Sequence, residues 1–180
     1  MLILVGPSAS GKTEIAKLLD IKYHLTKVIT HTTREKRINE KDDVDYHFVS
    51  KDDFLIMKSN NEFVETTTYN NNYYGTSKKE IADDKCVVLD PQGARAFFEL
   101  NDSHIYIVFL NCKESVRRFR MLYRQDDLEK IEDRLRVDRE TFNIRNQDFA
   151  NIIIDTSEDS PLELTDKIYN LYISHLESLK

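Results

Sequence analysis

Short apolar runs alternate with helical patterns along most of this chain. Four runs, at residues 2–5, 86–89, 105–110 and 152–154, are rich in β-branched residues, and residues 27–30 are a fifth candidate. Continuous apolar runs of this length are typical of parallel strands that are buried on both faces. Patterns with a period near 3.6 predict helices over residues 12–21, 94–100, 114–124, 128–145 and 162–179. The alternation predicts an α/β fold, with a parallel sheet and helices on both of its faces.

The pattern changes between residues 30 and 84, where short polar segments rich in Thr, Asn and Tyr replace the apolar runs. Alternating stretches at 46–49 and 63–67 predict strands, and residues 70–72 predict a hairpin tip. Ser50 with Asp53, and Ser77 with Glu80, have the spacing of helix starts. We therefore expect one domain with its core at about 1–29, 85–112 and 146–180 and a small, largely antiparallel β insertion at about 30–84.

Composition narrows the class of protein. With 180 residues, 40% hydrophobic and 32% charged, the chain is typical of one soluble globular domain. No apolar run approaches the roughly 20 residues of a membrane span, and Met1–Val5 lacks the basic start of a secretory signal, so we expect a cytoplasmic protein. The net charge of −6 argues against broad nucleic-acid binding. Cys86 and Cys112 have no partner at metal-ligand or redox spacing and are expected to be buried free thiols.

Residues 6–13, Gly-Pro-Ser-Ala-Ser-Gly-Lys-Thr, match the phosphate-loop pattern G-x-x-x-x-G-K-[ST] in full. The glycines let successive backbone N–H groups point into one concavity, to which the following helix adds its partial positive charge. Lys12 is expected to reach the outer phosphates, and the Thr13 hydroxyl to bind Mg²⁺. The alternative, a turn that binds nothing, is disfavoured by the strand before the loop and the helix after it. The residues expected to contact the nucleotide are Gly6, Ser8, Ala9, Ser10, Gly11, Lys12 and Thr13.

Two further segments are basic. Residues 30–37 begin where a core strand should end, which is where open α/β sheets bind ligands, and Arg34 with Arg37 can offer forked donors to one phosphate. An exposed basic loop fits these residues equally well, and His31 is expected to be satisfied or exposed rather than catalytic. The second segment, residues 116–145, interleaves eight arginines with acids, which also fits ordinary surface i,i+4 pairs.

The chain resembles the guanylate kinases, a family of P-loop nucleoside monophosphate kinases, over essentially its full length. Six segments in the same order carry the resemblance, at residues 6–13, 30–37, 44–50, 62–65, 72–77 and 89–95. It implies that the 30–84 insertion binds GMP and that residues 113–145 form an arginine-bearing lid. It also implies Mg²⁺-dependent phosphoryl transfer from ATP to GMP, and to dGMP, giving ADP and the diphosphate. We expect a monomer or homodimer with no nucleic-acid or membrane partner.

The resemblance also assigns residues to roles. The positions that would grip the acceptor phosphate are Thr30, Arg34, Arg37, Tyr46 and Tyr74. The positions that would read the guanine base are Glu65, Thr76 and Asp90. The catalytic cations would be Lys12, Arg34 and the lid residues Arg120, Arg124 and Arg134, whereas Arg117, Arg118 and Arg145 are expected to be surface charges. The base assignment is chemically sound, because a carboxylate matches the N1–H and amino donors of guanine and a hydroxyl can meet O6. A buried carboxylate would be left unpaired by AMP.

Two departures from the family pattern stand out. Family members often carry two acids in the form D-x-D-x-Q-G, whereas this chain has Val88 and Asp90 before Gln92-Gly93, so one carboxylate is missing. Ala9 replaces a common glycine, a mild change if its φ is negative. Two alternatives therefore remain open: an inactive guanylate-kinase-like module that binds a phosphorylated partner, and a related kinase with another phosphate acceptor. The intact phosphate loop weighs against the first, and Glu65 with Thr76 against the second.

Overall fold

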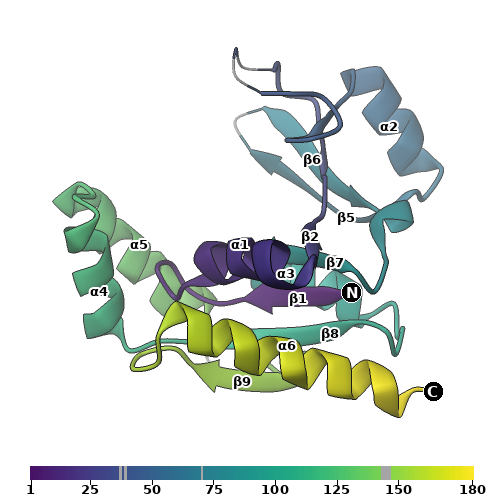
Figure 1. Cartoon of the computed structure of the whole chain (residues 1–180). Helices are drawn as coiled ribbons and strands as arrows, with labels where there is room; N and C mark the ends of the chain where they lie inside the picture. Colours follow the sequence, from purple (N-terminus) through teal and green to yellow (C-terminus); the bar gives the residue numbers. More distant parts are fainter. Residues whose placement is uncertain (37, 39, 70, 143–146) are drawn as a thin grey trace.

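A five-stranded parallel sheet forms the core of the chain, whose computed structural model describes residues 1–36, 38, 40–69, 71–142 and 147–180 (Figure 1). The strand order is β2-β7-β1-β8-β9, and every neighbouring pair is parallel. The strands are β1 (Leu2–Val5), β2 (Thr26–Lys27), β7 (Lys85–Leu89), β8 (Tyr106–Asn111) and β9 (Ile152–Asp155). The four predicted core strands are confirmed, whereas the fifth candidate is limited to two residues and begins one residue earlier than expected.

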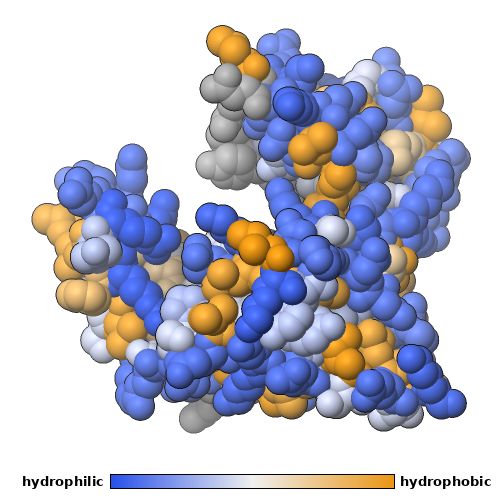
Figure 2. Space-filling view, viewed as in Figure 1, coloured by the Kyte–Doolittle hydropathy of each residue, from blue (hydrophilic) through white to orange (hydrophobic). Residues whose placement is uncertain are grey.

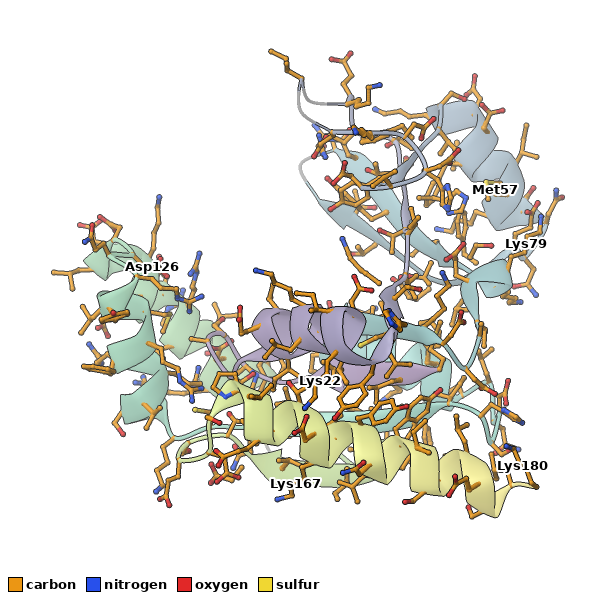
Figure 3. The ribbon with its side chains drawn as sticks, viewed as in Figure 1. Lys22, Met57, Lys79, Asp126, Lys167 and Lys180 are labelled. Carbon is orange, nitrogen blue, oxygen red and sulfur yellow. The ribbon has the colours of Figure 1, made fainter. Side chains whose placement is uncertain are left out.

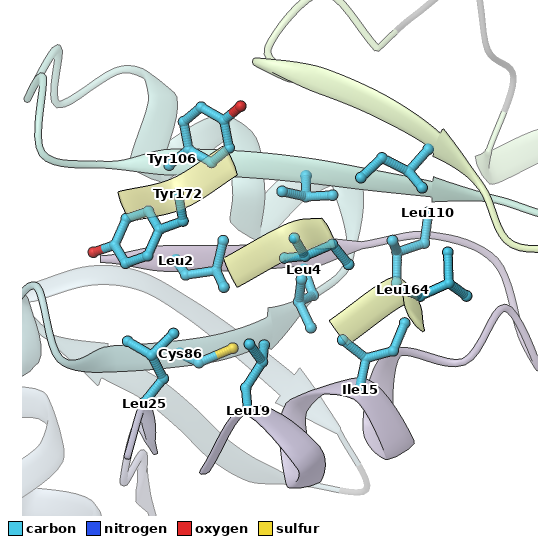
Figure 4. Packing of buried hydrophobic residues seen from close by; sticks show 13 residues of the cluster. Leu2, Leu4, Ile15, Leu19, Leu25, Cys86, Tyr106, Leu110, Leu164 and Tyr172 are labelled. Atoms are coloured by element: carbon cyan, nitrogen blue, oxygen red, sulfur yellow. The ribbon is translucent and has the colours of Figure 1, made fainter. Parts of the chain in front are cut away.

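Helices cover both faces of this sheet, as the sequence predicts: α1 (Lys12–Tyr23) and α6 (Pro161–Ser178) lie on one face, and α3 (Pro91–Phe98) lies on the other. The helices α4 (Glu114–Tyr123) and α5 (Leu128–Thr141) pack against each other. Successive side chains of a strand point to opposite faces. Leu2 and Leu4 of β1 therefore pack with residues of α1 and α6 (Figure 4), whereas Ile3 and Val5 pack with Phe97 of α3. This double burial explains why β1 reads as one continuous apolar run.

Burial on both faces holds for β1 and β8 but not for every core strand. Val88 of β7 is 37% exposed, and Ile153 of β9 is 44% exposed. The strand β9 lies at the edge of the sheet, where one face of the strand has less cover. The expectation of complete burial is therefore wrong for β7 and β9. Cys86 and Cys112 are buried and unpaired within the described part of the chain, as predicted.

Capping residues set where the helices begin. The predicted start of α6 is confirmed by a capping box in which Ser160 and Glu163 bond each other's backbone N–H groups. The predicted start of α3 at residue 94 is three residues late. Pro91 is the first helical residue, and the Asp90 carboxylate accepts the Gly93 N–H at 2.7 Å, so Asp90 is the N-cap. The helix α5 ends at Thr141, and the predicted end at 145 lies outside the described residues.

A second, four-stranded sheet corresponds to the predicted insertion. Its order is β4-β3-β6-β5, in which β3 and β5 are antiparallel to β6, and β3 is parallel to β4. The strands are β3 (His31–Thr32), β4 (His47–Phe48), β5 (Phe63–Tyr69) and β6 (Asn72–Ser77). The helix α2 (Lys51–Ser59) covers the sheet, where Phe54 stacks on Phe63 with ring centroids 4.5 Å apart. The expectation of a largely antiparallel insertion is confirmed, and the second predicted start, at Ser77, opens only a short 3₁₀ turn at Lys78–Glu80.

The second sheet and the α4–α5 pair project from the same side of the core (Figure 1). Figure 2 shows a hollow between these two projections, above α1. The phosphate loop joins β1 to α1 at the base of this hollow. No helix in the described residues is long and apolar enough to cross a membrane.

Candidate nucleotide-binding site

The phosphate loop passes tightly between the sheet and the helices α4 and α5. A Cβ on Gly6 would lie 2.4 Å from the Leu110 carbonyl oxygen, so glycine is required there. Ala9 has φ +60°, in the left-handed region, so the negative φ that would make this alanine a mild change is not observed. Such a conformation costs roughly 1–2 kcal/mol for a residue with a Cβ. The Ala9 methyl packs on the cluster of Met121, Ile131 and Leu135 from α4 and α5, which offsets part of that cost.

Lys12 is held inside the loop. Its Nζ donates to the carbonyl oxygens of Gly6, at 2.5 Å, and Pro7, at 2.8 Å. Burial lowers the pKa of Lys12 to about 8, and the nearby Asp138 carboxylate opposes this effect while Arg117 adds to it. The loop therefore contains a cation whose present partners are neutral carbonyls.

A cavity of about 640 Å³ lies between the phosphate loop, α4 and the start of α6. It brings together several of the predicted nucleotide-binding residues with Arg120 and Arg124. Sequence reasoning missed Phe119 and Tyr123, which line the cavity with their rings stacked at 6.4 Å between centroids. Their i,i+4 spacing on α4, interleaved with the two arginines, is the signal that could have found them. The lining residues are Ala9–Ile15, Phe119, Arg120, Tyr123, Arg124, Pro161 and Leu164.

The three predicted lid arginines differ in position. Arg120 donates to the carbonyl oxygens of Ala9, at 3.2 Å, and Thr156, at 2.6 Å. Arg124 donates from Nε to the Arg120 carbonyl and lines the cavity. Arg134 pairs with Asp126 at 3.0 Å, near the far end of the α4–α5 pair where Figure 3 labels Asp126, and it does not line the cavity. The structure therefore brings Arg120 and Arg124, but not Arg134, to the phosphate loop.

Arg117 is not the surface charge that the sequence predicts. Only 5% of its surface is exposed, and its Nη1 donates to the Asp138 carboxylate at 2.5 Å. The same carboxylate accepts the Ser8 N–H at 2.9 Å and the Ser8 hydroxyl at 3.2 Å. Arg117 is buried because it lies one turn before Met121, on the face of α4 that packs against α5 and the loop. By contrast, Arg118 is partly exposed and pairs with Glu132, and Arg145 lies outside the described residues.

Three of the predicted acceptor-phosphate residues, Arg34, Tyr46 and Tyr74, lie together beside the second sheet. The Arg34 guanidinium carbon lies 5.5 Å from the Tyr46 ring centroid. The ring centroids of Tyr46 and Tyr74 are 6.2 Å apart. Arg34 also donates to Glu40 at 2.7 Å. The backbone carbonyl of Thr30 accepts the N–H of His47, which ties the start of the insertion to β4. Arg37 lies outside the described residues.

Two of the three predicted base-reading residues, Glu65 and Asp90, line a second cavity, and Thr76 does not. Its volume is about 210 Å³, and its lining includes Glu65, Asp90 and Gln92. Thr76 is fully buried behind Glu65 and donates its hydroxyl to the Glu65 carboxylate at 2.7 Å. Burial raises the pKa of Glu65 and the Asp90 charge adds to this, whereas the Thr76 hydrogen bond opposes it. The cavity is thus lined by two acids, and one of them, Glu65, accepts a hydrogen bond from the buried Thr76.

The donor set at the phosphate loop fits a magnesium ion that arrives with a nucleotide. Thr13 is exposed at the start of α1 and lines the larger cavity. Among the described residues there is no group of three or more His, Cys, Asp or Glu side chains that could hold a metal by itself. Mg²⁺ is usually bound through one or two protein groups together with substrate phosphates and waters. A single hydroxyl beside the phosphate loop matches that mode of binding.

Comparison with known proteins gives consistent matches. The family model described as guanylate kinase matches residues 1–169. A guanylate kinase from Anaplasma phagocytophilum is 36% identical over 181 residues, covering 95% of this chain and 84% of the relative. One from Helicobacter hepaticus is 38% identical over 162 residues, covering 84% and 81%. The crystal structure of guanylate kinase from Anaplasma phagocytophilum matches with a TM-score of 0.65 and 26% identity, covering 97% of this chain and 84% of that one. The residues that the family model matches, 1–169, include every residue that lines the two cavities.

Proposed function

Since the chain belongs to the guanylate kinase family, we propose that it transfers the γ-phosphoryl group of ATP to GMP, and to dGMP, with Mg²⁺. The observation that carries the proposal is the pair of cavities, one on the phosphate loop and one around Glu65 and Asp90. Each has the chemistry of one substrate: N–H groups and cations for a triphosphate, and carboxylates for the donor edge of guanine.

On the donor side, Lys12 exchanges weak partners for strong ones. Its Nζ now donates to two neutral carbonyls, and phosphate oxygens are charged acceptors whose hydrogen bonds are roughly twice as strong. Arg120 and Arg124 already lie on the cavity, where their charges can stabilise the transferring group. Thr13 and the substrate phosphates would hold Mg²⁺, which would further neutralise the phosphate charge. Arg134 joins them only if α5 moves relative to the loop, because it now pairs with Asp126.

On the acceptor side, Arg34 lies beside the aromatic pair of Tyr46 and Tyr74. Its fork can hold the GMP phosphate while Tyr46 and Tyr74 donate their hydroxyls to the same group. Glu40 is its partner in the structure, so a dianionic phosphate competes with one carboxylate for Arg34. Arg37 follows Arg34 by three residues in the sequence, and its guanidinium would be a second donor to the same GMP phosphate.

The reaction needs positioning and charge stabilisation more than acid–base help. An oxygen of the GMP phosphate attacks the γ-phosphorus in line, the bond to the ADP oxygen breaks, and no covalent enzyme intermediate forms. The residues above hold the two phosphates together and compensate for their mutual repulsion. Glu65 accepts from the N1–H and amino groups of guanine, and it would be left unpaired by AMP.

Coupled ADP release tests this proposal with ATP, Mg²⁺ and a panel of GMP, dGMP, AMP, UMP and CMP. Turnover confined to the guanine nucleotides is expected. Lys12→Met should abolish it, whereas Lys17→Met, on the exposed side of the same helix, should not. Turnover with another acceptor would refute the substrate assignment. Binding of GMP without turnover on any acceptor would favour a binding module instead.

A further inference from the structure

A carboxylate of α5 accepts a hydrogen bond from a backbone N–H group of the phosphate loop. Asp138 belongs to α5, and its Oδ2 accepts the Ser8 N–H at 2.9 Å while Oδ1 accepts the Ser8 hydroxyl at 3.2 Å. The two residues are 130 positions apart in the sequence, so only the packing of α5 on the loop brings them together. Backbone N–H groups of this loop are the donors that a polyphosphate uses.

Arg117 supplies the cation for this internal anion. Its Nη1 carries both of its described contacts, to Asp138 Oδ2 at 2.5 Å and to the Ser8 carbonyl at 3.3 Å. Its Nε is buried and has no partner among the described residues. A guanidinium has five N–H donors in a fork that suits phosphate, and the Nε–H donor of Arg117 is unused among the described residues. The side chain is therefore placed and equipped to take a larger anion.

The larger cavity begins at the next residue. Ala9 is the first loop residue that lines it, directly after the Ser8 amide that Asp138 covers. Both charges act on Lys12, because Asp138 raises the pKa of Lys12 and Arg117 lowers it. A phosphoryl group extending from the cavity toward Ser8 would meet a carboxylate of the same sign at hydrogen-bond distance, and both cannot use one N–H. One anion must leave.

We propose that Asp138 competes with the terminal phosphoryl group of a nucleoside triphosphate for the Ser8 amide and for Arg117. When the phosphoryl group prevails, Arg117 transfers its fork from the carboxylate to that group and becomes a further cation at the reacting phosphate. A diphosphate is one phosphoryl shorter and does not reach this contact. The exchange therefore distinguishes ATP from ADP, and it couples the base of α5 to the presence of the γ-phosphate. The proposal rests on the proposed function for its nucleotide.

A purely structural role of the same contacts predicts the opposite result. If Asp138 only braces the loop in a shape that binds phosphates, its removal should weaken ATP and ADP alike. If it competes, its removal should strengthen the triphosphate and leave the diphosphate nearly unchanged. The ratio of the two dissociation constants is therefore the quantity to measure.

The experiment measures binding of ATP, ADP and inorganic triphosphate, each with Mg²⁺, by isothermal titration calorimetry without GMP. Asp138→Asn removes the charge and keeps the shape of the side chain. Since hydrogen bonds to charged groups are the strong ones, we expect Asp138→Asn to bind ATP and inorganic triphosphate tighter by about tenfold or more, with ADP changed by less than about twofold. Glu132→Gln is the matched control, because it breaks another α4–α5 ion pair, with Arg118, on the partly exposed side.

Two outcomes overturn the proposal: equal changes for ATP and ADP in Asp138→Asn, or weaker binding of ATP alone. If Asp138→Asn does not fold, a measurement on the native chain tests the proposal instead. In a crystal structure of the native chain with Mg²⁺ and a non-hydrolysable ATP analogue, Arg117 should contact the γ-phosphate and Asp138 should have left Ser8. Asp138 still bound to Ser8 beside the analogue would refute the exchange. Failure of the kinase assignment is separate, because these readouts need no GMP and no turnover.

Discussion

Replacing the Glu65 carboxylate by an amide tests the base-reading site directly. Glu65→Gln keeps the volume of the side chain and an oxygen that can still accept from Thr76, whose hydroxyl lies 2.7 Å from Glu65 Oε1. It replaces the other carboxylate oxygen, which accepts from guanine in the proposed complex, by an NH₂ group. The substitution therefore isolates the charge and one acceptor, with little change in packing.

The size of the effect follows from the hydrogen bonds at stake. The N1–H and amino groups of guanine would both donate to the carboxylate, and an amide nitrogen would face one of them as a second donor. Losing one charged hydrogen bond and weakening the other costs about 2–4 kcal/mol, or roughly a 30- to 1,000-fold loss in kcat/KM for GMP. AMP lacks these two donors, so any turnover of AMP should change little, and the preference for GMP should fall by nearly the same factor.

The pH dependence provides a second readout. Burial, with the Asp90 charge added, raises the pKa of Glu65 above its ordinary value, against the Thr76 hydrogen bond. Only the deprotonated group accepts both guanine donors, so kcat/KM for GMP should rise with pH through that raised pKa. The acid limb should be absent in Glu65→Gln, because the amide does not titrate.

Steady-state kinetics for GMP and AMP from pH 5 to 8 make both measurements, with Glu62→Gln as the matched control. Glu62 comes directly before β5, outside the smaller cavity, and should keep native kcat/KM and the acid limb. The reasoning is refuted if Glu65→Gln retains the native preference for GMP over AMP, or if its acid limb is unchanged.

Three further predictions concern the loop and the two acids. Asp138→Ala should lower the free energy of unfolding by about 3–5 kcal/mol, because it strands the buried Arg117, whereas Arg118→Ala should cost less than about 1 kcal/mol; equal urea midpoints would contradict this. Gly6→Ala should not yield the native fold by circular dichroism and nucleotide binding, since its Cβ would lie 2.4 Å from the Leu110 carbonyl oxygen; native binding of ATP would contradict that. Asp90→Asn should keep the α3 cap but move the acid limb for GMP to lower pH, because removing its charge lowers the pKa of Glu65; an unmoved limb would show that the two acids do not interact.

Local patterns in the sequence were sufficient for most of the helices and strands of the core and for the phosphate loop. The loop can be recognised because its eight residues act together in one short segment, between an apolar run and an amphipathic helix. The same holds for the α6 cap, where Ser160 and Glu163 interact within one turn. Even Asp90, whose side chain caps α3, follows a local rule that would have placed the helix start correctly.

The surroundings of individual charges were decided by tertiary structure alone. Arg117 and Arg118 are adjacent in sequence and chemically identical, yet one is buried against Asp138 and the other is partly exposed beside Glu132. Their difference depends on which face of α4 meets α5 and the loop, and that is set by the packing of Met121 and its neighbours. A charge pattern cannot distinguish a solvated pair from a buried one, because both satisfy the same spacing.

The backbone of the phosphate loop shows the same division. The sequence determines that residues 6–13 match the phosphate-loop pattern, it predicts Lys12 and Thr13 as the functional side chains of the loop, and it resembles the sequences of guanylate kinases. Only the fold brings Asp138, 130 residues away, onto the Ser8 amide, and only the fold holds Ala9 at φ +60° against α4 and α5. Interactions within a few residues are encoded by local order, whereas contacts between distant segments exist only after the sheet, α4 and α5 have packed together.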